Sequence, residues 1–303
     1  MNNISEEIKQ VFSQGSILTR LLFINVLVWI GIKIIMLILF LFNADIGTAT
    51  SVIRWFSVPA SLTSLLFKPW TLISYMFLHE DFWHIFFNML WLYWFGKIFL
   101  EYLDGKKMLV VYLLGGIMGA SLYIISFNLF PVFSAIKDVS YALGASASVL
   151  AITIAISTYI PNYSIHLMFL GPVRIKYIAL FAVVQDLLSI QNENAGGHIA
   201  HLGGALMGYY FIVQLKKGND ISKPLIGLLN TIQGYFVKEG SNLKVSHSNR
   251  GYSTRSKSDE EFNYEKKQRQ KQMDEILDKI SKSGYESLSK EEKDLLFKIS
   301  NKK

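Results

Sequence analysis

Residues 141–150 read YALGASASVL and place a serine, Ser146, where a loop passes into an apolar segment. A hydroxyl group at the start of a helix lies beside free backbone N–H groups and the positive end of the helix dipole. Both features stabilise an anion, which a nucleophilic serine requires when it forms a tetrahedral oxyanion. Serine and glycine are also common packing residues in membrane helices, so this stretch alone fits either a packing role or a catalytic role.

A second stretch, residues 196–204, reads GGHIAHLGG and offers a histidine base at the start of another apolar segment. Histidine ionises near neutral pH, so His201 has suitable chemistry to take the proton of Ser146. Small residues recur at helical spacing in both segments: Ala147, Ala151, Ala155, Gly204 and Gly208. Small residues on facing stripes allow helices to approach closely in a membrane. We therefore predict that the two segments touch near Ser146 and His201.

The composition is that of a membrane protein. Of the 303 residues 51% are hydrophobic, and they gather into long runs. The chain has no cysteine, which excludes disulfides and a thiolate nucleophile. Its net charge of +7 arises mainly after Lys216, which favours a membrane domain with a basic tail over a nucleic-acid-binding protein.

Six apolar runs are long enough, or nearly so, to cross a membrane, and they predict an all-α fold, a polytopic bundle of six transmembrane helices. The runs cover residues 17–42, 82–100, 108–127, 146–160, 173–190 and 198–215. The fourth run is short, so its helix would begin below the membrane surface, with Ser146 reached through a water-filled cavity. In the first loop, residues 52–59 and 65–78 are expected to lie in the outer interface as amphipathic pieces.

The distribution of lysine and arginine predicts that both termini are cytoplasmic. Residues 1–16 would then form a short cytoplasmic segment before the membrane domain, residues 17–217. In this orientation Ser146 and His201 lie toward the outer side at similar depth. No transit peptide is apparent, which favours a bacterial inner membrane as the location.

The tail divides into a linker, residues 218–264, and a short helical appendage, residues 265–303. The linker is expected to be polar and flexible apart from an apolar patch near Leu225 to Phe236. Ser289 and Glu292 are spaced as a capping box in front of an apolar run. Two short amphipathic helices joined around Gly284 would form a hairpin. The sequence leaves two roles open for the appendage, binding to a partner or a membrane and simple solubilisation.

The second apolar run begins with polar residues that are costly in a membrane unless they are used. His84 and Asn88 stand four residues apart, on one helix face, and we interpret them as oxyanion donors. A competing hypothesis is a zinc site built from four histidines: His79, His84, His198 and His201. We favour the interpretation without metal, since the spacing does not fit H-E-x-x-H. For Asp186, in the fifth run, we expect a structural contact rather than a triad role.

The motifs GAS, AHLGGxxxG and HxxxN occur in an order and spacing that resemble the rhomboid intramembrane serine proteases. The resemblance implies that Ser146 is the nucleophile and His201 the base, in a dyad without an acidic third member. It also implies an oxyanion hole formed by His84 and Asn88, no cofactor, and transmembrane proteins in a lipid bilayer as substrates. Cleavage would take place near the outer membrane face, gated by the fifth helix and the loop at residues 191–197.

The sequence departs from the family pattern at two positions near the serine. Ala147 stands where glycine is common, and Leu150 stands where an aromatic residue often packs on the histidine ring. Two other functions stay open. A catalytically silent rhomboid-like protein would bind client helices with the same fold, and a small-solute transporter would show inverted repeats, of which the sequence gives no convincing sign.

Overall fold

A computed structural model describes residues 15–167, 171–191 and 194–236, and five short pieces of the tail: 274–276, 278–280, 282–284, 287–289 and 291–293. The chain forms two units, Met1–Glu239 and Gly240–Lys303. The candidate site lies in the first unit. The predicted N-terminal segment falls almost entirely outside the described residues, as does most of the predicted linker.

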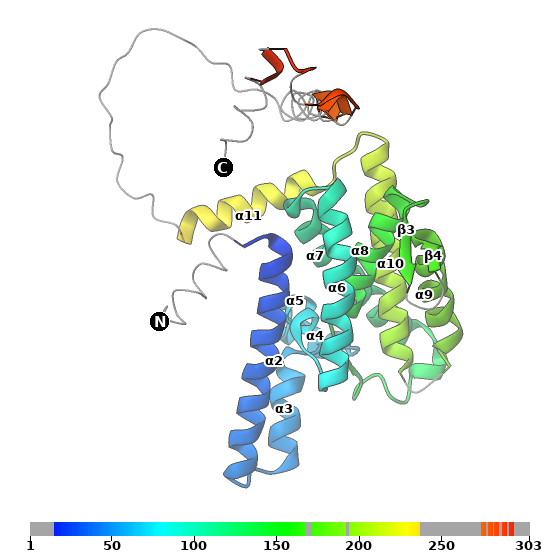
Figure 1. Cartoon of the computed structure of the whole chain (residues 1–303). Coiled ribbons are helices and arrows are strands. Elements are labelled where there is room, and N and C mark those ends of the chain that lie inside the picture. Colours follow the sequence, from blue (N-terminus) through cyan, green and yellow to red (C-terminus); the bar gives the residue numbers. More distant parts are fainter. Residues whose placement is uncertain are drawn as a thin grey trace. The chain divides into compact units, whose positions relative to one another are not determined.

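Long helices occupy the six predicted positions (Figure 1). They are α2 (Ile17–Leu41), α6 (Phe82–Tyr102), α7 (Gly105–Leu129), α8 (Ser146–Tyr159), α9 (Ile175–Ser189) and α10 (Ala195–Lys216). Two of them, α2 and α7, are clear candidates to cross a membrane by length and composition, and α8 is a shorter apolar helix. The helix positions are therefore confirmed, whereas the number of six membrane crossings stays a prediction.

Side-chain caps mark the start of two of the helices that carry the site, α6 and α10. The Asp81 carboxylate accepts from the backbone N–H of His84 at 2.8 Å and starts α6. The side-chain amide oxygen of Asn194 accepts a hydrogen bond from the backbone N–H of Gly197 at 3.1 Å, at the start of α10. Each cap satisfies a donor that the helix itself leaves free and contributes about 0.5–2 kcal/mol. The caps thereby place the candidate polar residues within the first two turns of their helices.

Helix α8 is the centre of the bundle. Every residue from Ala147 to Ser157 is buried, as expected for a helix that is apolar on all sides. Helix α10 lies directly against it. A Cβ added at Gly204 would be 2.1 Å from the Ala147 carbonyl oxygen, and one at Gly208 would be 2.2 Å from the Ala151 oxygen. The predicted contact between the fourth and sixth helices is therefore confirmed.

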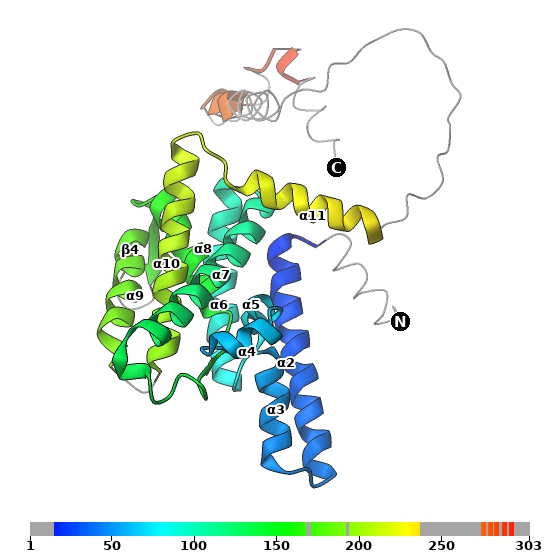
Figure 2. The same ribbon diagram turned by 180° about the vertical axis from the view of Figure 1, so that it is seen from behind.

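The first loop contains more structure than the sequence predicts. It forms α3 (Ile46–Phe56), α4 (Leu62–Phe67), α5 (Thr71–Ser74) and the short 3-10 helix η1 (Tyr75–Phe77). Helix α3 packs beside α2 (Figure 2). The apolar pieces at residues 52–59 and 65–78 are each divided among two or more of these short elements. Their expected position in the outer interface stays a prediction.

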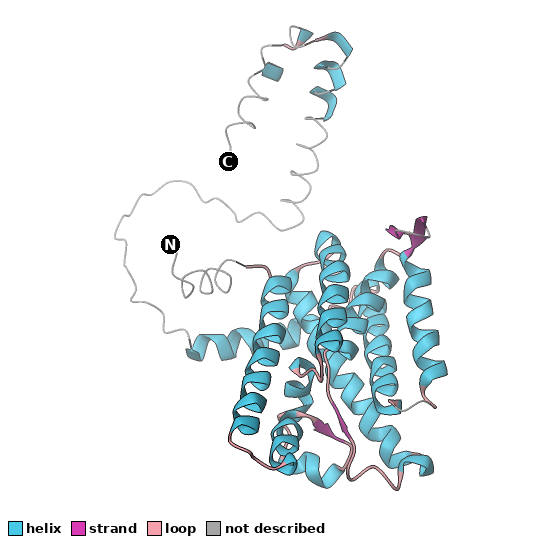
Figure 3. Ribbon diagram, turned by 60° about the horizontal axis from the view of Figure 1, so that its bottom comes forward, coloured by secondary structure: helices cyan, strands magenta, loops and turns pink. Residues whose placement is uncertain are grey.

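Two small antiparallel sheets also differ from the prediction of an all-α fold (Figure 3). The chain is nevertheless mostly helical. Strands β3 (Ser164–Leu167) and β4 (Gly171–Arg174) pair with each other between α8 and α9. Strand β1 (Val58–Pro59) pairs with β2 (Tyr141–Ala142), just before Ser146. The second pairing ties the first loop to the segment that carries the serine, a contact between residues too distant in the chain for a local pattern to predict.

Part of the predicted flexible linker is a helix, α11 (Ser222–Phe236). Its residues Leu225 and Ile226 pack against the core of the first unit, next to α7. The apolar patch that interrupts the predicted linker, Leu225 to Phe236, therefore lies in a helix.

The appendage has the predicted local structure at its described residues. Its capping box is present: the Ser289 backbone N–H donates to the Glu292 carboxylate at 2.6 Å, and the Glu292 N–H donates to the Ser289 hydroxyl at 3.2 Å. Gly284 has a φ of +78°, and Lys279 pairs with Glu292 at 2.9 Å. The turn and the ion pair agree with the predicted helical hairpin.

Candidate active site

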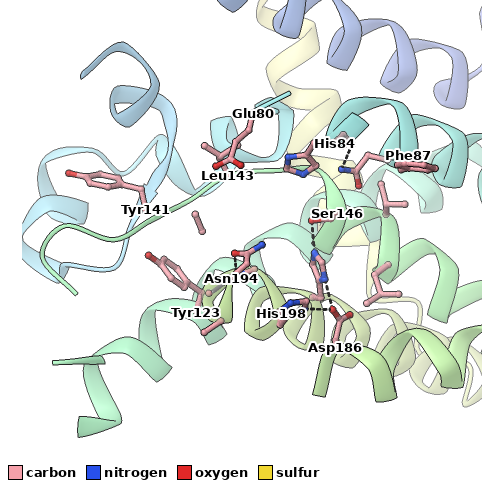
Figure 4. Close-up of a pocket in the computed structure, with 18 of the residues that line it drawn as sticks. Glu80, His84, Phe87, Tyr123, Tyr141, Leu143, Ser146, Asp186, Asn194 and His198 are labelled. Carbon is pink, nitrogen blue, oxygen red and sulfur yellow. Dashed lines mark hydrogen bonds and ion pairs between the residues drawn. The ribbon is translucent and has the colours of Figure 1, made fainter. Parts of the chain in front are cut away.

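Ser146 is the first residue of α8, and His201 lies in the second turn of α10. The Ser146 Oγ is 2.6 Å from His201 Nε2, within hydrogen-bonding distance (Figure 4). The contact spans 55 positions of the chain and follows from the close packing of α8 on α10. The structure therefore brings together the predicted nucleophile and base.

Asp186 of α9 contacts the other nitrogen of the same imidazole. Its Oδ1 is 2.8 Å from His201 Nδ1 and also 2.8 Å from His198 Nδ1. The sequence predicted a structural contact for Asp186 but not these partners, and neither prediction nor resemblance placed an acidic residue beside His201. One feature of the sequence indicates this contact. A carboxylate inside an apolar run requires polar partners, and His198 and His201 follow Asp186 closely in the chain.

The loop before Ser146 makes room for a small group next to the hydroxyl. Gly144 has a φ of +135°, and its N–H donates to the Tyr75 carbonyl at 2.9 Å. A Cβ added at Gly144 would lie 3.0 Å from His84 Nε2 and 3.4 Å from Ser146 Oγ. His84 and Ser146 thus border one small space, which is where an oxyanion donor would be needed if Ser146 acts as a nucleophile.

Asn88 lies one turn after His84 on α6 and lines the same cavity as Ser146. Its Nδ2 donates to the His84 carbonyl oxygen at 2.9 Å. A carboxamide has two N–H groups, so a second donor is left for a ligand. The structure therefore gathers both predicted oxyanion donors at the cavity, and their catalytic role stays a prediction.

A cavity of about 960 Å³ opens over these residues. Its walls come from α6, α7, α9, α10 and the segment before α8, and they combine the polar residues above with aromatic side chains such as Trp83, Phe87 and Tyr123. Apolar walls with a few convergent polar groups are typical of a binding site for an organic ligand or a peptide.

The four histidines of the zinc hypothesis divide into two pairs. His79 and His84 form one pair, with ring centres 5.1 Å apart. His198 and His201 form the other pair, and together with Asp186 they are the group among the described residues that is suited to a metal, with ligand atoms within 4.8 Å of one another. Ligands around tetrahedral zinc are separated by about 3.3 Å. Both nitrogen–oxygen distances are 2.8 Å, so the group fits hydrogen bonds better than a metal.

Residues 66–217 match the family described as "Rhomboid domain". This chain belongs to the rhomboid family. The matched region includes all the residues of the site described above. The resemblance noted in the three motifs is thereby confirmed, and rhomboid proteins are membrane proteins.

Two curated relatives are similar to this rhomboid protein. One is "RHOMBOID-like protein 12, mitochondrial" of Arabidopsis thaliana, 32% identical over 158 residues, or 49% of this chain and 47% of the relative. The other is "Presenilin-associated rhomboid-like protein A, mitochondrial" of Danio rerio, 32% identical over 161 residues, or 52% of this chain and 39% of the relative. The match covers less than half the length of either relative.

The tail matches a different family. Residues 257–302 match DUF6576, a family of unknown function. This region contains the capping box and the turn at Gly284. The tail therefore has a recognisable sequence of its own, separate from the rhomboid domain.

Proposed function

We propose that this rhomboid protein is an intramembrane serine endopeptidase. The observation that carries the proposal is the 2.6 Å contact between Ser146 Oγ and His201 Nε2 at the base of a cavity. A serine hydroxyl becomes a competent nucleophile when a base accepts its proton, and here the base is already within reach. Ser146 is accordingly the nucleophile and His201 the general base.

The reaction follows from these positions. As the Ser146 oxygen bonds to the carbonyl carbon of the scissile peptide, its proton passes to His201 Nε2. His84 and Asn88 donate hydrogen bonds to the oxyanion that forms. The carbon–nitrogen bond then breaks as His201 returns the proton to the leaving amine. Water, deprotonated by His201, attacks the acyl-enzyme and releases the second product and the free serine.

The substrates in this proposal are transmembrane proteins, cut near the outer membrane face. All six helices of the bundle would cross the bilayer, with both termini in the cytoplasm. The shortest of them, α8, would start with Ser146 below the membrane surface. The location in a bacterial inner membrane stays a prediction of the sequence, and the two relatives named above are mitochondrial proteins.

Cleavage of a reporter with one transmembrane helix, in proteoliposomes, tests the proposal. The wild-type protein should cleave, and Ser146→Ala and His201→Ala should not. Ser157→Ala is the matched control, because Ser157 is buried in the same helix at the end remote from the cavity. A fluorophosphonate probe should label Ser146 in the wild-type protein. Cleavage by Ser146→Ala at the wild-type rate would overturn the proposal.

The same experiment distinguishes a protease from the alternative, a catalytically silent protein. A catalytically silent protein that binds client helices would neither cleave the reporter nor react with the probe, although it would still fold. It would retain the reporter in a pull-down from detergent.

A further inference from the structure

One carboxylate on α9 is shared by two histidines on α10. Asp186 Oδ1 accepts from both Nδ1 atoms at 2.8 Å, and the two histidines stand three residues apart, on one face of their helix. We infer that Asp186 is a positioning residue for the base, so that the site is an Asp186–His201–Ser146 triad, and that His198 holds the carboxylate in place. The inference rests on the proposed function.

Asp186 determines which nitrogen of His201 carries the hydrogen. A carboxylate accepts hydrogen bonds and does not donate, so the Nδ1 atom that contacts it must carry the hydrogen. A neutral imidazole has one N–H, and the lone pair therefore lies on Nε2. That atom is 2.6 Å from Ser146 Oγ. Asp186 thereby selects the tautomer that is able to take a proton from the serine.

Asp186 also compensates the charge that His201 gains in the proposed reaction. Once His201 has taken the proton, the ring is a cation at the bottom of a partly apolar cavity, next to a carboxylate. An opposite charge at hydrogen-bonding distance stabilises this cation, because the buried Asp186 carboxylate is poorly screened by solvent. The carboxylate therefore acts on the step in which charge forms, although it does not touch the substrate.

His198 holds the Asp186 carboxylate in place. Asp186 is 4% exposed, and a buried carboxylate with a single partner is costly. His198 supplies a second N–H to the same oxygen. Helix α9 has few other buried residues, Ile175 and Ala179, and both lie far along the helix from Asp186. The pair Asp186–His198 therefore fastens this end of α9 to α10 and keeps the carboxylate aimed at His201.

Substitution of Asp186 by asparagine and by alanine tests the inference in the reporter assay. The amide of Asp186→Asn can donate to Nδ1, which moves the hydrogen to Nε2 and removes the lone pair that faces Ser146. We expect kcat to fall by roughly 100- to 10,000-fold, with KM changed little. Asp186→Ala should be no worse than Asp186→Asn. A purely structural role predicts the opposite order, since asparagine has nearly the shape of aspartate.

Two further variants complete the comparison. His198→Ala removes one of the two donors to the carboxylate but leaves the His201 contact, so its loss of kcat should be smaller than that of Asp186→Asn. Ser157→Ala is again the control, because this buried polar residue of α8 does not line the cavity. It should cleave as the wild type does.

A second readout does not depend on cleavage. In protein with ¹⁵N-labelled histidine in micelles, the His201 Nδ1 should carry the hydrogen in the wild type and the Nε2 in Asp186→Asn. Thermal unfolding of each variant establishes that it is folded. If Ser146→Ala abolishes cleavage but Asp186→Asn keeps the wild-type rate and tautomer, the triad is overturned and the proposed protease function stands. If wild type does not cleave, the protease function fails, and the tautomer alone decides the role of Asp186.

Discussion

Gly144 separates His84 from Ser146: a Cβ at this position would lie 3.0 Å from His84 Nε2 and 3.4 Å from Ser146 Oγ. The residue has a φ of +135°, which L side chains rarely adopt. The small space that it leaves is the place where the oxyanion of the proposed reaction would form. Glycine is therefore required both for the backbone turn and for the room beside the serine.

Gly144→Ala should abolish cleavage, because the methyl group fills the space between the serine and His84 and strains the loop. Activity should fall at least about 100-fold, the scale of losing an oxyanion donor. Gly218→Ala is a matched control, since Gly218 also has a positive φ, +84°, but no atom lies within 4 Å of its added Cβ. Equal activity of the two variants in the reporter assay would contradict this role of Gly144.

Asn88→Ala should lower kcat by about 100- to 1,000-fold and leave KM nearly unchanged, because the amide acts on the oxyanion and not on the bound substrate. Ser121→Ala is the control. The Ser121 hydroxyl also donates a hydrogen bond to the carbonyl oxygen four residues before it, at 2.8 Å, but Ser121 does not line the cavity. A steady-state analysis of both variants in proteoliposomes separates kcat from KM. A change in KM alone would assign Asn88 to substrate binding.

Gly208→Ala should destabilise the protein, since its Cβ would lie 2.2 Å from the Ala151 carbonyl oxygen and push α10 away from α8. The expected loss of unfolding free energy is about 1–3 kcal/mol, as for other overpacked cores. Gly31→Ala on α2 has nothing within 4 Å and should not destabilise the fold. The midpoint of thermal unfolding in micelles measures both, and equal midpoints would refute the close contact.

His79 should make stability depend on pH. Burial, with a smaller effect of the neighbouring His84, lowers the pKa of His79 from 6.5 to about 3. In the unfolded chain His79 binds a proton below pH 6.5, whereas in the folded protein it stays neutral down to about pH 3. Stability is therefore full above pH 6.5 and is lost as the pH falls from that value toward 3, on the order of 2 kcal/mol by pH 5.

Thermal unfolding at pH of about 7 and about 5 checks this dependence. His79→Gln cannot take up the proton, so its unfolding midpoint should fall less than that of wild type on acidification. His166→Gln is the control, because His166 is exposed on β3 and should behave as wild type does. If His79→Gln and wild type lose the same stability, the buried neutral state of His79 is refuted.

The positions of the long helices can be predicted from the residues alone, because a continuous apolar run of sufficient length forms a helix with its own backbone hydrogen bonds. The contact of α8 with α10 can be predicted as well, since the small residues Ala147, Gly204 and Gly208 allow the two helices to approach closely. The pairing of Ser146 with His201 follows from this packing. The capping box in the tail is equally local, with partners three residues apart.

Three features could be found only in the folded protein: the partners of Asp186, the pairing of β1 with β2, and the packing of α11 next to α7. Each depends on the rotation of one helix about its axis, or on the path of a loop, relative to a segment far away in the chain. A residue pattern tells which face of a helix is polar but not which neighbour that face meets. For this reason the sequence pointed to the serine and the histidine, while the carboxylate beside them required the fold.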